Sequence, residues 1–209
     1  MNFKLFNVEI ETAETIRMPE EVHETVKSID IAMEKLAEAA EKTRLVFAKY
    51  SSSNAGDQFY LAYDAMTKLS KDISEYATNI NGIEHQVCDL FNRILNYEGR
   101  NGEFQYRTAK IAVTTNQAET QKFKYSADEI REILAALITF QETVDQTVKQ
   151  TQQESEDVRA IWNDAQYIKF KEYIDSCMES IIAGTLKVNE YVEALINSLT
   201  HLKERALEI

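Results

Sequence analysis

Ile161-Trp162-Asn163-Asp164 is the stretch that decides the fold, because it separates two long helical patterns near the C-terminal end of the chain. One periodic run of apolar residues ends before it, and another begins at Tyr167. Asn and Asp favour turns and helix N-caps, since their short side chains hydrogen-bond nearby backbone N–H groups. The indole of Trp162, the one Trp of the sequence, can fill the gap where two antiparallel helices diverge. We therefore predict a helical hairpin with its turn at Trp162.

The first half of the chain carries the same pattern. Its apolar positions follow a 4-3 rhythm from Val22 to Tyr50, stop at the breakers of residues 51–56, and resume from Phe59 to Tyr97. An average spacing of about 3.5 residues is typical of helices that pack along one seam. The second run predicts a helix of about 40 residues, roughly 60 Å long. One Pro and five Gly in 209 residues leave little room for an all-β fold.

The second half is a copy of the first. An offset of 108 residues, the separation of Asn54 and Trp162, aligns the two halves without a gap. It pairs Val22 with Ile130, Val26 with Leu134, Phe59 with Tyr167, Ala62 with Phe170 and Ile73 with Ile181. The register is kept on both sides of the turn, so we interpret the pattern as a tandem duplication.

Each half also begins with a segment rich in β-branched and aromatic residues, at residues 3–12 and 104–114, where a short strand is expected. We place the two repeats at residues 1–101 and 102–209. A single hairpin leaves one side of its apolar seam in water, whereas two packed hairpins close a core. The sequence therefore predicts a mainly α protein. Two tandem long helical hairpins, each preceded by a short β-strand-like segment, form one elongated antiparallel four-helix bundle.

A hairpin of two long helices with Trp-x-Gly at its central turn resembles the WXG family, the small helical substrates of type VII secretion systems. The second half, from about Tyr125 to Ile209, is similar to such a protein along its whole length. At the motif position it has Trp162-Asn163-Asp164, with Asp in place of Gly, and the first half has Asn54-Ala55-Gly56, with the Trp lost. Each copy thus carries half of the motif. These six residues form the turn motif that the resemblance connects with partner binding.

The resemblance implies a function in bacterial protein export. Family members pair as dimers of hairpins, so a tandem copy resembles a dimer fused into one chain, either a monomer or a weak homodimer. The implied role is non-enzymatic: a substrate, chaperone-like partner or adaptor that binds a secretion ATPase or a co-secreted effector. The family's Tyr-x-x-x-Asp/Glu export signal does not follow either hairpin, where Asn101 is four residues after Tyr97 and Leu195 four after Tyr191. The alternative is a structural coiled-coil or an assembly or virion scaffold protein unrelated to secretion.

Trp162 itself has two interpretations. As part of the structure, the indole packs over the turn and against Tyr167. As part of a binding site, it is an exposed anchor for a secretion ATPase or another partner, since an aromatic side chain buries a large area with little loss of entropy.

Composition and charge exclude several classes of protein. Hydrophobic residues make up 44% and charged residues 28%, which is ordinary for a globular protein and too apolar for a disordered one. A net charge of −12 argues against binding to nucleic acid or to anionic lipid surfaces. Residues 1–20 lack the apolar core of a signal peptide, and no apolar run has the length of a transmembrane segment. We expect a protein that is cytoplasmic, or secreted without a cleaved signal peptide.

The sequence predicts no catalytic, cofactor-binding or metal site. His85 and Cys88 have the spacing of a two-ligand metal clip, but structural sites usually need four ligands and the sequence has no other Cys/His cluster. Cys88 and Cys177 stand alone on apolar stripes, as buried cysteines do. Motifs for nucleophilic catalysis and for phosphate binding are missing. We interpret the scattered acidic residues as a solvated face.

Overall fold

The computed structural model describes residues 19–50, 56–99, 103–112 and 127–207. Within these ranges lie helices α1 (Pro19–Tyr50), α2 (Asp57–Tyr97), α3 (Ala127–Arg159) and α4 (Ala165–Leu207). α2 and α4 have 41 and 43 residues, as the uninterrupted apolar spacing predicts. The prediction of a mainly α protein is confirmed.

The ends of the helices follow from the local sequence. Acidic residues lie in the first turns of α1, α2 and α3, where they complement the positive end of the helix dipole. α2 ends just before Gly99, whose φ of 65° is the left-handed conformation that favours glycine. The N–H of Glu98 bonds back to the carbonyl of Ile94 at 2.9 Å and closes the last turn. The breaker sequence at Gly99 therefore stops a helix that the apolar pattern would otherwise extend.

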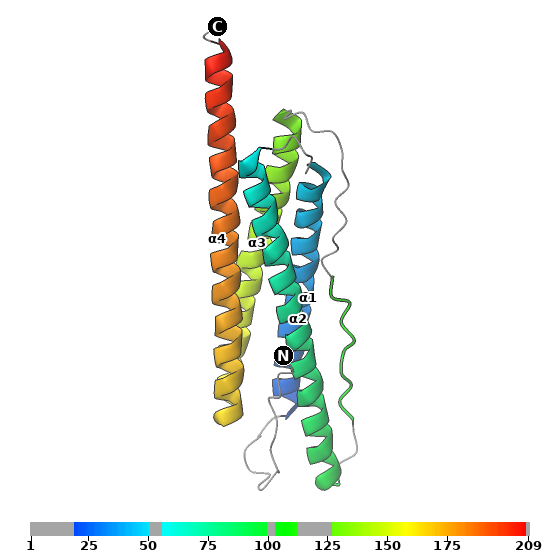
Figure 1. Cartoon of the computed structure of the whole chain (residues 1–209). Helices are drawn as coiled ribbons and strands as arrows, with labels where there is room; N and C mark the ends of the chain where they lie inside the picture. The colour runs from blue at the N-terminus through cyan, green and yellow to red at the C-terminus, as the bar shows by residue number, and fades with distance from the viewer. Residues whose placement is uncertain (1–18, 51–55, 100–102, 113–126, 208–209) are drawn as a thin grey trace.

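The four helices form one antiparallel bundle (Figure 1). α1 packs against α2 and α3, and α2 packs against α1 and α4, whereas α3 and α4 make far fewer contacts with each other. α1 ends and α2 begins at one end of the bundle, while α3 ends and α4 begins at the opposite end. Every pair of neighbouring helices is therefore antiparallel.

The apolar seams of the two hairpins meet in the same core. The largest aromatic side chains buried there are Trp162, Phe47, Phe59, Phe91, Phe140 and Phe170. They come from all four helices and from the turn between α3 and α4. Burial of each large apolar side chain contributes about 1.5–3 kcal/mol, so the contact between the hairpins is a main source of stability.

Residues 103–112, which we call the extended segment, run along α1 and α2 (Figure 1). α2 ends at one end of the bundle and α3 begins at the other, so the connection must travel the length of the molecule. The backbone of this segment is extended but forms no β-ladder within the described residues. The predicted strand over 104–114 is thus not found in its described part. The predicted strand at 3–12 lies outside the described residues.

The backbone groups of the extended segment find their hydrogen-bond partners in side chains of the helices. Buried or half-buried backbone groups need such partners, which a strand would find in a neighbouring strand. Asn92, Asn81 and Ser74 of α2 donate to its carbonyl groups at 2.6–3.1 Å. Glu84 of α2 and Glu34 of α1 accept from its N–H groups at 3.2 and 2.8 Å. Side chains therefore replace the β-partner that the sequence suggested.

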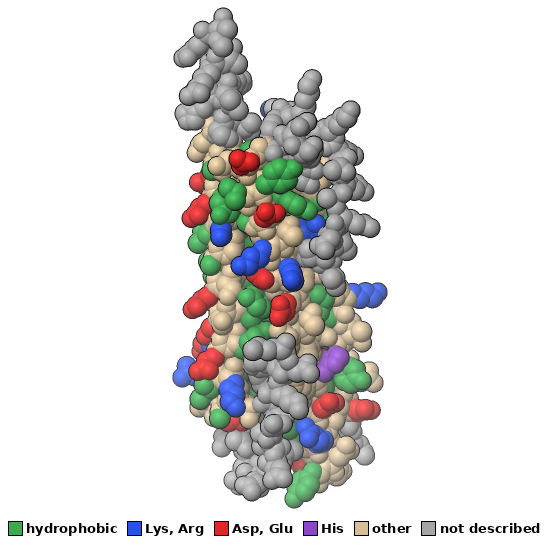
Figure 2. Space-filling model, in the orientation of Figure 1, with side chains coloured by type: hydrophobic (Ala, Val, Ile, Leu, Met, Phe, Trp, Pro, Cys, Tyr) green, Lys and Arg blue, Asp and Glu red, His purple; other side chains and the backbone are tan. Residues whose placement is uncertain are grey.

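None of the helices in the described ranges has an apolar stretch long enough to cross a membrane. The face in Figure 2 carries acidic and basic side chains intermixed along the bundle, with small apolar areas between them. Exposed apolar side chains on α3 and α4 include Ile138, Ile168, Ile182 and Leu186. This face is therefore mixed in charge rather than the acidic face expected from the sequence, and the acidic side chains of Asp30, Glu41 and Glu84 are buried.

Candidate functional site

The predicted turn motif of the second repeat lies between α3 and α4. The N–H of Trp162 bonds back to the carbonyl of Val158 at 2.8 Å, which closes the end of α3. Oδ1 of Asp164 then accepts from the N–H groups of Gln166 and Tyr167 at 2.8 and 3.0 Å. An aspartate in this position is an N-cap and lies at the positive end of the helix dipole. Asp164 therefore starts α4.

Trp162 is 2% exposed, in contact with the first turns of α4. Its ring stacks on Phe170 with centroids 5.7 Å apart, and it meets Tyr167 edge-on at 6.1 Å. This packing matches the first interpretation, an indole that fills the space between the helices. The buried ring offers a partner almost no surface, whereas Asn163 beside it is exposed.

The motif of the first repeat is described only at Gly56, since Asn54 and Ala55 lie outside the described residues. Gly56 is exposed and directly precedes α2 with φ −65° and ψ 163°, an extended conformation open to any residue. Phe59 and Phe47 fill the core near this turn, with ring centroids 6.1 Å apart. Gly56, at the start of α2, and the Trp162 turn lie at opposite ends of the bundle (Figure 1). The structure therefore does not bring them into one site.

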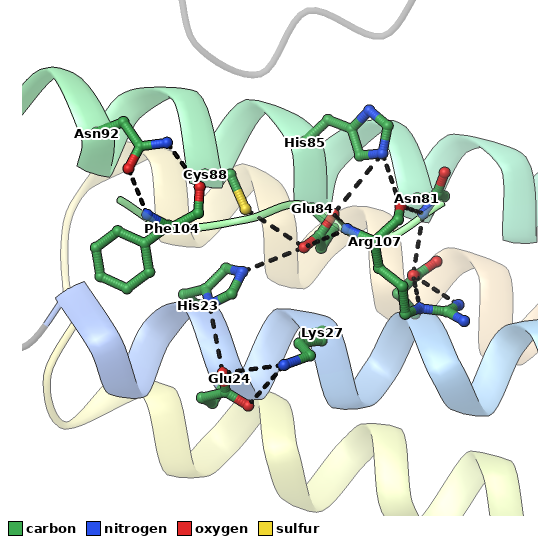
Figure 3. A network of polar contacts seen from close by, with 11 residues as sticks. His23, Glu24, Lys27, Asn81, Glu84, His85, Cys88, Asn92, Phe104 and Arg107 are labelled. Atoms are coloured by element: carbon green, nitrogen blue, oxygen red, sulfur yellow. Dashed lines mark hydrogen bonds and ion pairs between the residues drawn. The ribbon is translucent and has the colours of Figure 1, made fainter. Parts of the chain in front are cut away.

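A second site, missing from the sequence prediction, is a buried polar cluster between α1 and α2 (Figure 3). His23 of α1 and Glu84 and Cys88 of α2 are 4%, 0% and 0% exposed. Nε2 of His23 lies 3.2 Å from Oε1 of Glu84, and Sγ of Cys88 lies 3.4 Å from the same oxygen. A nitrogen, an oxygen and a sulfur atom of metal-ligand type therefore lie within 4.8 Å of one another.

Glu84 is the centre of this cluster. The Cys88 S–H donates to Oε1 of Glu84, and the same oxygen lies within hydrogen-bond distance of Nε2 of His23. The backbone N–H of Arg107, from the extended segment, donates to its Oε2 at 3.2 Å. Burial and the negative charge of Glu84 raise the pKa of the Cys88 thiol to about 12. The thiol is therefore protonated near neutral pH and is a poor nucleophile in this state.

The other side of the His23 ring is held as well. Nδ1 lies 3.5 Å from Oε1 of Glu24, which also accepts from Lys27 at 3.2 Å. The ring of Phe104 packs edge-on against the imidazole, with centroids 5.1 Å apart. Asn92 fixes Phe104 by accepting from its N–H at 2.6 Å and donating to its carbonyl at 2.8 Å. The extended segment thus covers the cluster (Figure 3).

Arg107 anchors the middle of the extended segment. Its Nε donates to Oδ2 of Asp30 at 2.9 Å, and its guanidinium also pairs with Glu34. Asn81 donates to the same oxygen of Asp30 at 3.0 Å. Asp30 is 1% exposed, and burial raises its pKa, against the opposing effect of the hydrogen bonds from Asn81 and Arg107. The cation of Arg107 therefore offsets the free-energy cost of burying a carboxylate at Asp30.

His85 lies at the edge of the cluster rather than in it. Its Nε2 is 2.8 Å from the carbonyl oxygen of Arg107 and 3.9 Å from Glu84, and its ring packs on Tyr106. The spacing of His85 and Cys88 in the sequence therefore does not form a clip. Glu84 and Cys88, one helical turn apart, share the face of α2 that meets α1. The histidine that joins them comes from α1, and spacing within α2 cannot reveal it.

The donor set of the cluster is that of a metal-binding site. Imidazole nitrogen, thiolate sulfur and carboxylate oxygen are the usual protein ligands of Zn²⁺ and related transition metals. Comparison of the chain with protein-family models, with curated proteins and with solved structures finds no match. What the protein does is therefore inferred from its own residues.

Proposed function

We propose that the protein is a non-enzymatic helical bundle of the WXG type. It acts through protein–protein contacts as a substrate, chaperone-like partner or adaptor in a type VII-like secretion pathway. The main support is the pairing of the two hairpins: α1 packs on α3 and α2 packs on α4, so equivalent helices of the two repeats are neighbours. Two copies of one hairpin related by a two-fold axis pack in this way. A WXG-like dimer fused into one chain would have the same arrangement.

The surface that we assign to the partner is the turn between α3 and α4. A hollow of about 270 Å³ there is lined by Asn163 and Ile168 together with charged side chains of α3 and α4. Ile168 is 54% exposed. An apolar side chain within a polar rim is the usual composition of a protein–protein contact. In this proposal the buried Trp162 fixes the turn, while Asn163 and Ile168 touch the partner.

Export from the source cell tests the secretion role. We expect the full chain outside cells that have the secretion ATPase, and its loss from the medium when the ATPase gene is deleted. Export that is unchanged by the deletion would overturn the substrate version. An adaptor would instead remain in the cell and co-purify with a co-secreted effector.

A charge placed at the turn tests the assigned surface. Ile168→Glu should weaken partner binding by about tenfold or more, which corresponds to at least about 1.4 kcal/mol. Ile182→Glu is the matched control, because Ile182 is a 40% exposed isoleucine on the same helix, away from the turn. Circular dichroism should show the same helix content in both variants. Equal losses of binding, or no loss in either variant, would contradict the assignment.

The scaffold alternative predicts a different behaviour in solution. Light scattering of the purified full chain should give a compact monomer or a weak dimer if the two hairpins already bury each other's apolar seams. Growth into large particles would favour an assembly protein and count against the proposed adaptor role.

A further inference from the structure

We propose that His23, Glu84 and Cys88 form a binding site for one zinc-like transition-metal dication. The site lies between α1 and α2, apart from the α3–α4 turn, and its function goes beyond partner binding. Side chains of two helices direct a nitrogen, an oxygen and a sulfur atom to one point (Figure 3). All three side chains are buried.

The separations between the ligand atoms fit a tetrahedral ion. Zn–N and Zn–O bonds of about 2.0–2.1 Å and a Zn–S bond of about 2.3 Å place neighbouring ligand atoms about 3.3–3.6 Å apart. In the cluster, His23 Nε2 and Cys88 Sγ lie 3.2 and 3.4 Å from Glu84 Oε1. The three atoms lie within 4.8 Å of one another. Small side-chain shifts are therefore enough to surround an ion.

The donor set also selects the class of ion. Thiolate and imidazole favour Zn²⁺ and its neighbours in the first transition row, whereas Mg²⁺ and Ca²⁺ prefer oxygen ligands. Metal binding displaces the proton of the Cys88 thiol. The thiolate and the Glu84 carboxylate then carry two negative charges, which a dication neutralises. The loaded site is thus electrically neutral, as a buried site should be.

The surroundings of the three ligands resemble those of metal centres. Metal-bound histidines usually face a carboxylate or carbonyl with their second nitrogen, and His23 Nδ1 lies 3.5 Å from Glu24. The N–H of Arg107 holds the Glu84 carboxylate, and Phe104 covers the imidazole. Three protein ligands leave the fourth position of a tetrahedral ion open, as in catalytic rather than structural zinc sites.

A role for the cluster in packing alone explains less. Glu84 accepts the N–H of Arg107, which packing requires, but replacing buried ionic groups by apolar residues of similar volume is often neutral or stabilising, so packing does not by itself require the imidazole of His23 or the thiol of Cys88. A metal ion uses all three side chains at once. It would also tie α1 to α2 beneath the extended segment.

Metal binding is tested on the full chain after a chelator has removed any bound metal. Titration with Zn²⁺ in a calorimeter should show one ion per chain. Co²⁺ serves as the spectroscopic probe, since Co²⁺ bound to a thiolate gives a charge-transfer band in the near ultraviolet. A tetrahedral Co²⁺ ion adds bands in the visible. These bands report on the ligands directly, whatever the effect on stability.

Matched variants locate the ion. Cys88→Ser and His23→Gln should lose stoichiometric Zn²⁺ binding, and Cys88→Ser should also lose the charge-transfer band. Cys177→Ser, at the other buried cysteine, and His85→Gln, at the neighbouring histidine, should bind like the unmodified chain. Glu24→Gln should weaken binding by about 10–100-fold, the usual effect of removing the partner of a ligating histidine. Circular dichroism checks that each variant remains helical.

Two results would overturn the site. One is an unmodified chain that takes up no stoichiometric Zn²⁺ and gives no cobalt–thiolate band, which does not depend on how any variant folds. The other is binding that survives Cys88→Ser or that is lost in Cys177→Ser. Export and co-purification involve the α3–α4 turn instead, so failure of the metal site leaves the proposed function standing, and the reverse also holds.

Discussion

Two helical glycines differ in what surrounds their Cα atoms. A Cβ atom at Gly82 of α2 would meet no atom within 4 Å, whereas one at Gly184 of α4 would lie 2.6 Å from Cδ1 of Leu69. Leu69 belongs to α2 and is 4% exposed. α4 therefore approaches α2 closely at Gly184, and the side chain of Leu69 takes the space that a larger residue would need.

Alanine at each position tests this close approach. Gly82→Ala should raise the free energy of unfolding by about 0.5–1 kcal/mol, because alanine is the better helix former. Gly184→Ala gains the same helix propensity but crowds Leu69, and overpacking costs about 1–3 kcal/mol. We expect it to be less stable than Gly82→Ala by that amount in urea denaturation. Equal stabilisation by the two changes would mean that Leu69 moves aside without cost.

Cys177 links stability to alkaline pH. It is 2% exposed, and burial raises the pKa of its thiol from 9.0 to about 11. The unfolded chain releases this proton first, so the stabilisation is complete below pH 9 and is lost as the pH rises through 11. The loss approaches about 1.4 kcal/mol per pH unit between the two pKa values, and amounts to about 2 kcal/mol from pH 9 to pH 11. The unfolding free energy of the unmodified chain should fall by this much more than that of Cys177→Ala between pH 9 and 11, and parallel pH curves would contradict the prediction.

Single residues could be predicted where their role is local. Asn163 and Asp164 interrupt an apolar period, which predicted the turn, and an aspartate at that place is a suitable cap. His23 could not be assigned in the same way. It stands beside the seam position Val22, and its partners Glu84 and Cys88 lie 61 or more residues away on α2. Only the packing register of α1 against α2 brings them together.

Polar contacts with side chains of α1 and α2 hold the extended segment, and Arg107 is its anchor. Arg107→Ala removes the cation beside Asp30, which is 1% exposed. We expect the free energy of unfolding to fall by about 3 kcal/mol, since breaking a buried ion pair costs about 3–5 kcal/mol and Asn81 still bonds to Asp30. Arg131→Ala is the control: its exposed pair with Asp128 should contribute less than about 1 kcal/mol.

Urea denaturation measures the free energy of unfolding of Arg107→Ala and Arg131→Ala. Equal stabilities would show that the extended segment contributes little to the fold. Limited proteolysis adds a second measurement, because loss of Arg107 should expose residues 103–112 to cleavage before the helices are cut. Cleavage at other places in the chain should proceed at the same rate in Arg107→Ala as in the unmodified chain.

The sequence predicted the helices better than the extended segment, for a physical reason. Helices carry their hydrogen-bond partners within themselves, so apolar spacing is enough to indicate them. β-branched and aromatic residues indicate an extended backbone, but they do not say what the backbone bonds to. Here Asn92 and Glu84 take the place of a neighbouring strand. The strand predicted over 104–114 is therefore not shown in its described part, residues 104–112.

The two hairpins of the molecule are not equivalent in their packing. α1 and α2 pack extensively on each other, whereas α3 and α4 contact each other little and rest mainly on α1 and α2. Isolated helices are marginal in water without an apolar partner. A fragment of residues 1–112 should therefore keep most of its helical circular dichroism at 222 nm, and a fragment of residues 113–209 should lose most of it. A second fragment that is as helical and as cooperative as the first would contradict this prediction.

The matching apolar patterns of the two halves predicted the bundle but not this inequality. The offset of 108 residues placed equivalent apolar seams in both halves, which is enough to expect packed hairpins. Matching apolar seams do not predict which of the neighbouring helix pairs will pack closely and which will make few contacts. That depends on side-chain sizes across the interfaces, such as Gly184 against Leu69, and on the path of the long connection.

The connection between α2 and α3 also affects the order in which the two hairpins fold. The helix side chains that hold the extended segment, from Asp30 to Asn92, all precede it in the chain and leave the ribosome first. The first hairpin can therefore close while the second is still being made, as domains generally fold from the N-terminus during synthesis. α4 emerges last and packs mainly on α2, so the final step of assembly is docking onto a surface that has already formed.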